Sequence, residues 1–78
     1  MYAMSIQVKF FASLREKMGV SESKIDSVAT AGEAWDRTTN NAERPINVLV
    51  AINLEYAQFD DPISDGDEVA FFPPVTGG

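Results

Sequence analysis

The residues of this chain with the clearest chemical potential are its last two, Gly77-Gly78, which end in a carboxylate. Neither glycine carries a side chain, so this end can enter a slot too narrow for any other residue. ATP can activate a carboxylate as an acyl-adenylate, and a sulfur donor can then displace AMP and leave a thiocarboxylate. The alternative is that the two glycines are a frayed end or a cloning remnant without a role.

The residues before the glycines favour a functional tail. Pro73-Pro74 cannot extend a β-ladder, and two successive prolines hold the chain in a stiff polyproline-like rod. Val75-Thr76 then offer side chains that a partner can grip before the glycines enter a slot. From Phe72 to the terminal carboxylate the reach is about 20 Å, at roughly 3.3 Å per residue. The sequence therefore predicts a semi-rigid arm with a reactive tip.

The rest of the chain supplies no catalytic group for this tip. Cys and His are both absent from the 78 residues, which excludes disulfides, thiol chemistry and zinc sites and removes the commonest general base. No P-loop, Gly-rich phosphate motif or calcium loop is found, so no metal site is predicted. Asp65, Asp67 and Glu68 adjoin a turn signal and are interpreted as turn and surface residues. We expect a substrate or carrier without a permanently bound cofactor, whose catalysts are its partners.

Negative charge is concentrated in the second half of the sequence. Residues 1–44 hold six acidic and six basic side chains, whereas residues 45–78 hold six acidic side chains and no base, which gives a net charge of -6. Nucleic acid is therefore an unsuitable partner, and a basic protein surface is a better match. Ordinary solubilising charge is the alternative. No apolar run approaches the roughly 20 residues of a membrane span, and no secretory signal is present, so we expect a cytoplasmic protein.

Alternation and capping signals predict a domain over residues 1–72, followed by a flexible tail over residues 73–78. Ile6 to Phe10 alternate as a half-buried strand. Ser13 and Glu16 form a capping box for a short helix over residues 14–18 that Gly19 ends, and residues 24–28 predict a second strand in a hairpin with the first. A second capping box opens the main helix, from residue 31 to about 40, which Trp35 seats on the sheet.

Three further strands complete the predicted sheet. Residues 46–52 form a nearly continuous apolar run suited to a central strand, residues 53–55 a turn, and residues 56–57 a short return strand. After a loop, residues 68–72 form the last strand, parallel to the first. One helix across such a mixed sheet is an α+β arrangement, the β-grasp or ubiquitin-like fold.

Side-chain alternation places two phenylalanines on the outer surface near the tail. If Val69 and Phe71 face the helix, then Ala70 and Phe72 face outward, and the same argument applies to Phe11 on the first strand. Exposed aromatic side chains at this point suggest an anchor for a partner, unless a bulge or register shift buries one of them.

The C-terminal run, Asp65-Gly66-Asp67-Glu68-Val69-Ala70-Phe71-Phe72-Pro73-Pro74-Val75-Thr76-Gly77-Gly78, closely resembles the MoaD family of ubiquitin-like sulfur carriers. This family is the small subunit of molybdopterin synthase. Residues 8–12, with Arg15-Glu16 and Gly19, resemble its first strand and helix, as do residues 51–53 before the loop. The resemblance implies a β-grasp fold and a C-terminal Gly78 that cycles between carboxylate and thiocarboxylate.

The resemblance also implies the partners and the reaction. An E1-like enzyme would use ATP to adenylate Gly78, and a sulfurtransferase would install the sulfur. The tail would enter the large synthase subunit, within a heterotetramer that converts cyclic pyranopterin monophosphate into molybdopterin. The positions that the resemblance assigns to partner binding are Phe11, Arg15, Phe72, Pro73, Pro74, Val75, Thr76 and Gly77.

Three alternatives stay open at this point. The chain could be a sulfur carrier for thiamine or for tRNA thiolation, although Phe71-Phe72-Pro73-Pro74 favours molybdopterin. It could be a ubiquitin-like modifier that forms isopeptide bonds. Ubiquitin, however, carries basic residues just before its two glycines, and this tail has none. It could also be a non-reactive adaptor, for which masking the C-terminus would leave function intact.

Overall fold

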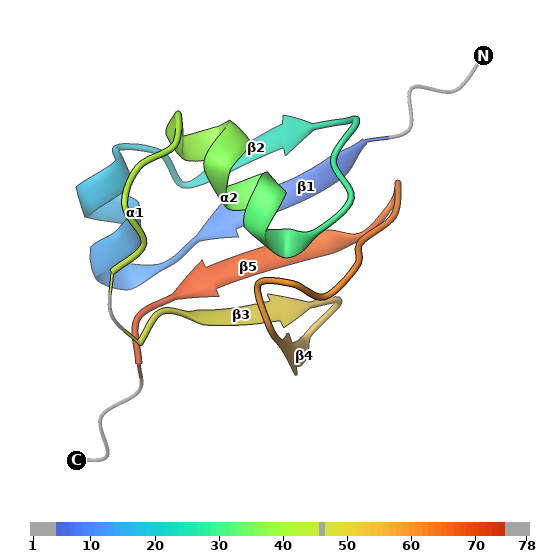
Figure 1. Cartoon of the computed structure of the whole chain (residues 1–78). Helices are drawn as coiled ribbons and strands as arrows, with labels where there is room; N and C mark the ends of the chain where they lie inside the picture. The colour runs from blue at the N-terminus through green and yellow to red at the C-terminus, as the bar shows by residue number, and fades with distance from the viewer. Residues whose placement is uncertain (1–4, 46, 75–78) are drawn as a thin grey trace.

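A computed structural model describes residues 5–45 and 47–74, which form a mixed five-stranded sheet and two helices (Figure 1). The strand order is β2-β1-β5-β3-β4. The two central strands, β1 and β5, are parallel, and the other pairs are antiparallel. The main helix lies across one face, which confirms the predicted α+β, β-grasp architecture. The elements are β1 Ile6–Phe10, α1 Ala12–Met18, β2 Glu22–Ile25, α2 Ala31–Thr39, β3 Leu49–Ile52, β4 Glu55–Ala57 and β5 Glu68–Phe72.

Trp35 of α2 is the centre of the core and, as predicted, seats this helix on the sheet. Its side chain is fully buried, and its ring packs edge-on against Phe71, with 5.1 Å between centroids, and against Phe10 at 5.8 Å. Phe10 and Phe71 stack on each other across the parallel strands. The indole N–H donates to the Ala42 carbonyl at 2.9 Å, so the one polar atom of this side chain is satisfied.

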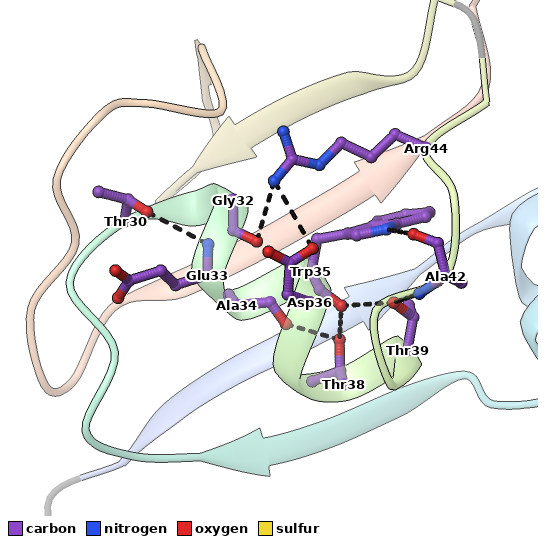
Figure 2. Close-up of polar contacts among 10 residues, drawn as sticks. All are labelled: Thr30, Gly32, Glu33, Ala34, Trp35, Asp36, Thr38, Thr39, Ala42 and Arg44. Atoms are coloured by element: carbon purple, nitrogen blue, oxygen red, sulfur yellow. Dashed lines mark hydrogen bonds and ion pairs between the residues drawn. The ribbon is translucent and has the colours of Figure 1, made fainter.

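Side-chain hydrogen bonds hold both ends of α2, as Figure 2 shows. Thr30 is the N-cap, and its hydroxyl accepts from the Glu33 N–H at 3.2 Å, which confirms the predicted start. Thr38 and Thr39, unfavourable inside helices, donate to the carbonyls of Ala34 and Trp35. These hydroxyls therefore tie the last turn together where intrinsic helix propensity is weak.

Gly32 allows the first turn of α2 to approach the β4–β5 loop closely. Its N–H donates to the Phe59 carbonyl at 2.7 Å, and its carbonyl accepts from Arg44 at 3.3 Å. The Arg44 guanidinium also lies 3.7 Å from Asp36 (Figure 2). It lies 4.4 Å from the centroid of the Phe59 ring as well. A Cβ on Gly32 would lie 2.8 Å from the Arg44 Nη2 and 3.1 Å from the Phe59 carbonyl oxygen. The Arg44 side chain can move aside, so the backbone carbonyl of Phe59 is the contact that restricts a side chain at this helix position.

Replacing Gly32 with alanine should destabilise the fold. Overpacking costs about 1–3 kcal/mol, and the helix-propensity gain of up to about 1 kcal/mol is small in the first turn. We therefore expect the free energy of unfolding to fall by about 1–2 kcal/mol in urea titrations. Gly32→Ala should cost less in an Arg44→Ala background, because the shorter contact is then gone. An unchanged or raised stability in the wild-type background would contradict this packing argument.

The first helix begins differently from the sequence prediction. Ser13 was expected to cap it, but α1 begins at Ala12 with Phe11 as N-cap, and no side chain caps its N-terminus. The chain turns as soon as β1 ends, because Ala12 adopts a φ of 54° and the N–H groups of Leu14 and Arg15 donate to the Phe11 carbonyl. The predicted end is confirmed: Gly19 is left-handed, with a φ of 73°.

Two strands are shifted or shorter than predicted. The second strand is Glu22–Ile25 and not residues 24–28, because Ser27 has a φ of 61° and leaves the extended conformation, although its hairpin pairing with β1 is confirmed. The central apolar strand begins at Leu49 and not at residue 46. Asn47, with a φ of 67°, interrupts the extended chain, and residue 46 lies outside the described residues.

Hydrogen bonds fasten the β3–β4 turn to the start of β5. The Asn53 N–H donates to the Glu68 carbonyl, and its side-chain oxygen accepts from the Glu68 N–H. The Asn53 amide also donates to Asp67 at 3.0 Å, while the Ser64 N–H donates to the other Asp67 oxygen at 2.8 Å. The hydrogen bond from Asn53, followed by that from Ser64, lowers the pKa of Asp67 below its ordinary value of 3.8.

This pKa shift should make Asp67 a source of pH-dependent stability. Its pKa is lower in the folded chain than in the unfolded chain, so the ionised carboxylate stabilises the fold above pH 3.8. That contribution is lost as the pH falls through the lowered pKa. Urea titrations should therefore show Asp67→Asn to be less stable than wild type at neutral pH, with the difference shrinking as the pH falls below 3.8 and through the lowered pKa.

Asp65→Asn is the matched control, since it removes the same charge two residues away. Among the described residues no hydrogen bond to the Asp65 side chain is found. A stability difference between Asp67→Asn and wild type that stays constant across this pH range would contradict the role given to the ionised carboxylate.

Candidate functional site

The described residues end at the root of the predicted arm. Val75, Thr76, Gly77 and Gly78 lie outside them, so the structure neither supports nor contradicts the prediction for the reactive tip. The last strand ends at Phe72, as two prolines after it require. Pro73 is half-buried and Pro74 is exposed. Because β5 lies between β1 and β3, the tail starts from the middle of the sheet (Figure 1).

Phe11 and Phe72 lie next to each other, as the sequence predicted. Phe10 pairs with Phe71 in the parallel ladder, and the Phe11 N–H donates to the Phe71 carbonyl at 3.1 Å. Phe10 and Phe71 are buried beneath α2, so alternation puts the two following side chains on the open face of the sheet. Phe11 is 44% exposed, whereas Phe72 is half-buried because Tyr56 packs against it, with 5.9 Å between the ring centroids.

Tyr56 and Leu49 complete this apolar surface, and the sequence prediction missed both. Leu49 pairs with Phe72 across the β3–β5 ladder, and Tyr56 pairs with Ala51 on the far side of β3. Tyr56 is 75% exposed. We call the surface formed by Phe11, Leu49, Tyr56 and Phe72 the open-face patch. Only the register of β3 between β4 and β5 brings these side chains together, and that register cannot be read from one strand.

Ala70 and Arg15, two further residues predicted to lie on the surface, differ in how exposed they are. Ala70 is on the open face, as predicted, but it is only 8% exposed because strands β1 and β3 flank it closely. Arg15 is exposed on α1, one turn beyond Phe11, and the described part of the chain offers it no ion pair. Its position relative to the open-face patch follows only from its place on α1, the helix that starts directly after Phe11.

The open face is divided into an apolar and a polar part. Away from the tail root, Lys9 pairs with Glu68 at 3.6 Å, and Gln7 donates to Glu22 at 2.7 Å. An apolar patch with a polar border is typical of a surface that binds another protein. The open-face patch has this composition and lies directly beside the root of the tail.

The acidic residues lie mostly away from the tail root. Glu55 begins β4 and Glu68 begins β5, while Asp65 and Asp67 lie in the turn before β5. Strand β5 runs from this end of the sheet to the tail, so these carboxylates and the tail root are at opposite ends. The acidic half of the sequence therefore does not form a charged surface around the tail root.

Two further features of the described residues concern a metal site and a membrane span. In residues 5–45 and 47–74 no three Asp or Glu side chains are grouped as metal ligands. Neither helix in that part of the chain is long and apolar enough to span a bilayer. The sequence contains no His or Cys.

Two neighbouring phenylalanines should respond differently to truncation. Phe71→Ala removes a fully buried ring and should lower the free energy of unfolding by about 3–5 kcal/mol. Phe72→Ala removes a half-buried ring from the open face and should cost about 1–2 kcal/mol. Urea titrations followed by the fluorescence of Trp35, the only tryptophan, would measure both. Similar costs for the two variants would contradict the assignment of these residues to opposite faces.

Comparison with known proteins adds a family and relatives. The model of the ThiS family matches residues 8–78. The molybdopterin synthase sulfur carrier subunit of Escherichia coli (strain K12) is 36% identical over 84 aligned positions, covering 94% of this chain and 99% of the relative. A crystal structure of SAMP1 from Haloferax volcanii has a TM-score of 0.78 at 32% identity, covering 95% of this chain and 99% of that chain. A second crystal structure, of the H. volcanii small archaeal modifier protein 1, has a TM-score of 0.77 at 29% identity. The match covers 94% of this chain and 100% of that chain.

Proposed function

Because the chain belongs to the ThiS family, we propose that it is the sulfur carrier subunit of a molybdopterin synthase. The observation that carries this proposal is the nearly full-length similarity to a relative with that name, in a chain that itself ends in two glycines. The fold is compatible with it, since the central strand ends at Phe72, within the open-face patch, and Pro73-Pro74 follow directly.

The proposed reaction takes place on the terminal carboxylate of Gly78. On an E1-like enzyme, a carboxylate oxygen attacks the α-phosphorus of ATP, which forms an acyl-adenylate and releases pyrophosphate. A sulfur donor supplied by a sulfurtransferase then attacks the acyl carbon, and AMP leaves, which yields the thiocarboxylate. In the large synthase subunit, this sulfur passes to cyclic pyranopterin monophosphate, and water restores the carboxylate.

The chain itself contributes docking and positioning. We propose that Phe11, Arg15 and Phe72, with the rest of the open-face patch, contact the large subunit, so that the proline root directs the tail into its active site. A semi-rigid arm loses less conformational entropy on capture than a free coil. In this proposal the chain binds no permanent cofactor, ATP belongs to the activating enzyme, and the protein works in the cytoplasm.

A second candidate function is protein modification, which the similarity to SAMP1 favours. A lysine amine would then attack the same acyl-adenylate, which would form an isopeptide bond in place of a thiocarboxylate. Carriers for thiamine or for tRNA thiolation would share the sulfur chemistry and differ only in the final acceptor. All these candidate functions use Gly78 as the reacting residue. The modifier differs from the sulfur carriers in the nucleophile that attacks the acyl-adenylate.

Intact-mass spectrometry would test the proposal. The untagged chain is incubated with ATP, an E1-like activating enzyme and a sulfide source. We expect a mass gain equal to replacement of one oxygen by sulfur, no gain in a chain lacking Gly78, and a reduced gain in Gly78→Ala, because its methyl group obstructs the narrow slot.

The acceptor is tested next, with the large synthase subunit and cyclic pyranopterin monophosphate. Formation of molybdopterin by the thiocarboxylate form supports the proposed function. No mass gain, with the activating enzyme shown to be competent on a known carrier, would contradict it. Conjugated ladders in cell extracts that disappear when Gly77-Gly78 are deleted would favour the modifier function instead.

A further inference from the structure

Leu54, in the β3–β4 turn, is an exposed apolar residue that the proposed function leaves unexplained. Its side chain is 88% exposed, more than Phe11 or Tyr56. Its φ is 72°, following a φ of 52° at Asn53. Two-residue hairpin turns with positive φ at both positions favour Asn followed by Gly, because a branched side chain is strained there. In the free chain, glycine at this position would relieve both the strain and the apolar exposure.

The turn that carries Leu54 is held rigidly. Asn53 makes backbone and side-chain hydrogen bonds to Glu68, and its amide donates to Asp67, whose other oxygen accepts from Ser64. The backbone next to Leu54 is therefore anchored and is not part of a loose loop. A side chain carried on an anchored backbone loses less conformational entropy on binding than one carried on a loose loop.

Leu54 lies in the turn between the two strands, β3 and β4, that carry Leu49 and Tyr56 of the open-face patch. Tyr56, two residues later, packs on Phe72 within that patch. Leu49, which pairs with Phe72, lies five residues before Leu54 along β3, a distance of about 17 Å for an extended chain. A partner of ordinary size that covers the patch can therefore also reach the turn, because a standard interface buries about 800 Å² per partner.

The charge around the turn indicates the kind of partner. Glu55 follows Leu54 directly, and the hydrogen bonds of Asn53 bring Asp67 and Glu68 beside the turn. Residues 45–78 contain no basic side chain; Lys9 of β1 pairs with Glu68 at 3.6 Å, which leaves Glu55 and Asp67 as the negative charges beside the turn that have no ion pair among the described residues. A second copy of this chain would bring like charges together in a symmetric contact at this turn, whereas a basic surface would complement them.

We propose that Leu54 is a second docking anchor, which inserts into an apolar pocket bordered by Lys or Arg side chains on the large subunit of the synthase. This inference rests on the proposed function, and it makes the large subunit contact the carrier at both ends of the sheet. The anchor at the tail root directs the arm, and the anchor at the turn fixes the orientation of the carrier. Leu54 is thus a specificity-determining residue about 17 Å from the root of the tail.

Leu54→Gly tests the proposal because stability and binding should change in opposite directions. Urea titrations should show Leu54→Gly to be more stable than wild type, because glycine relaxes the turn. Calorimetric titration of the full-length chain with the large subunit from the same organism should show its Kd raised by about 5- to 30-fold. Leu54→Met, which keeps an apolar side chain, should bind within about threefold of wild type.

Further variants separate this proposal from the proposed function. Glu55→Gln should slow association and reduce its dependence on salt, because the rim charge steers the encounter. Phe72→Ala is the control for the open-face patch and should also raise the Kd. If Leu54→Gly binds as tightly as wild type while Phe72→Ala binds more weakly, the second anchor is excluded and the proposed function stands.

Two other results would also overturn the second anchor. Failure of the wild-type chain to bind the large subunit at all would reject it together with the proposed function. Concentration-dependent dimers in analytical ultracentrifugation that Leu54→Gly abolishes would assign the residue to self-association instead.

Discussion

The parallel pairing of β1 with β5 is the contact on which the arrangement of this molecule depends. It places the last strand in the centre of the sheet, so the tail starts from the most rigid part of the fold. The same pairing stacks Phe10 on Phe71 beneath α2 and brings Phe11 beside Phe72 on the other face. One ladder therefore supplies both the core that fixes the root of the tail and the surface beside it.

The core can be small because one large side chain organises it. Trp35 contacts Phe10 and Phe71 from the sheet and Phe59 from the β4–β5 loop, and its indole N–H also holds the loop after α2. Three segments distant in sequence thus meet on one side chain. In a domain of this size such convergence matters, because little other apolar surface can be buried.

Much of this fold could be predicted from local sequence patterns, and the predictions that were wrong have local causes. Alternation identified β1 and β5, and the capping box at Thr30 identified the start of α2, because these signals depend only on neighbouring residues. The Ser13 capping box was wrong because the turn at Ala12 starts the helix earlier. The sequence analysis did not recognise Tyr56 as part of a surface. Strand β4 has only three residues, and the neighbours of Tyr56 on the sheet become known only from the pairing of β4 with β3.

The tail residues, which carry the proposed chemistry, are easier to identify from the sequence than the residues proposed to bind the partner. The tail can be interpreted from its residue order and its family resemblance, because the chemistry proposed for it involves only consecutive residues and a carboxylate. A docking surface requires side chains that are neighbours in space, and this one combines β1, β3, β4 and β5. Leu54 lies between these cases: its type and its turn can be read from the sequence, but its strain and exposure appear only in the fold. A rigid domain of this kind can therefore change partners through the turn and patch residues while its tail stays the same.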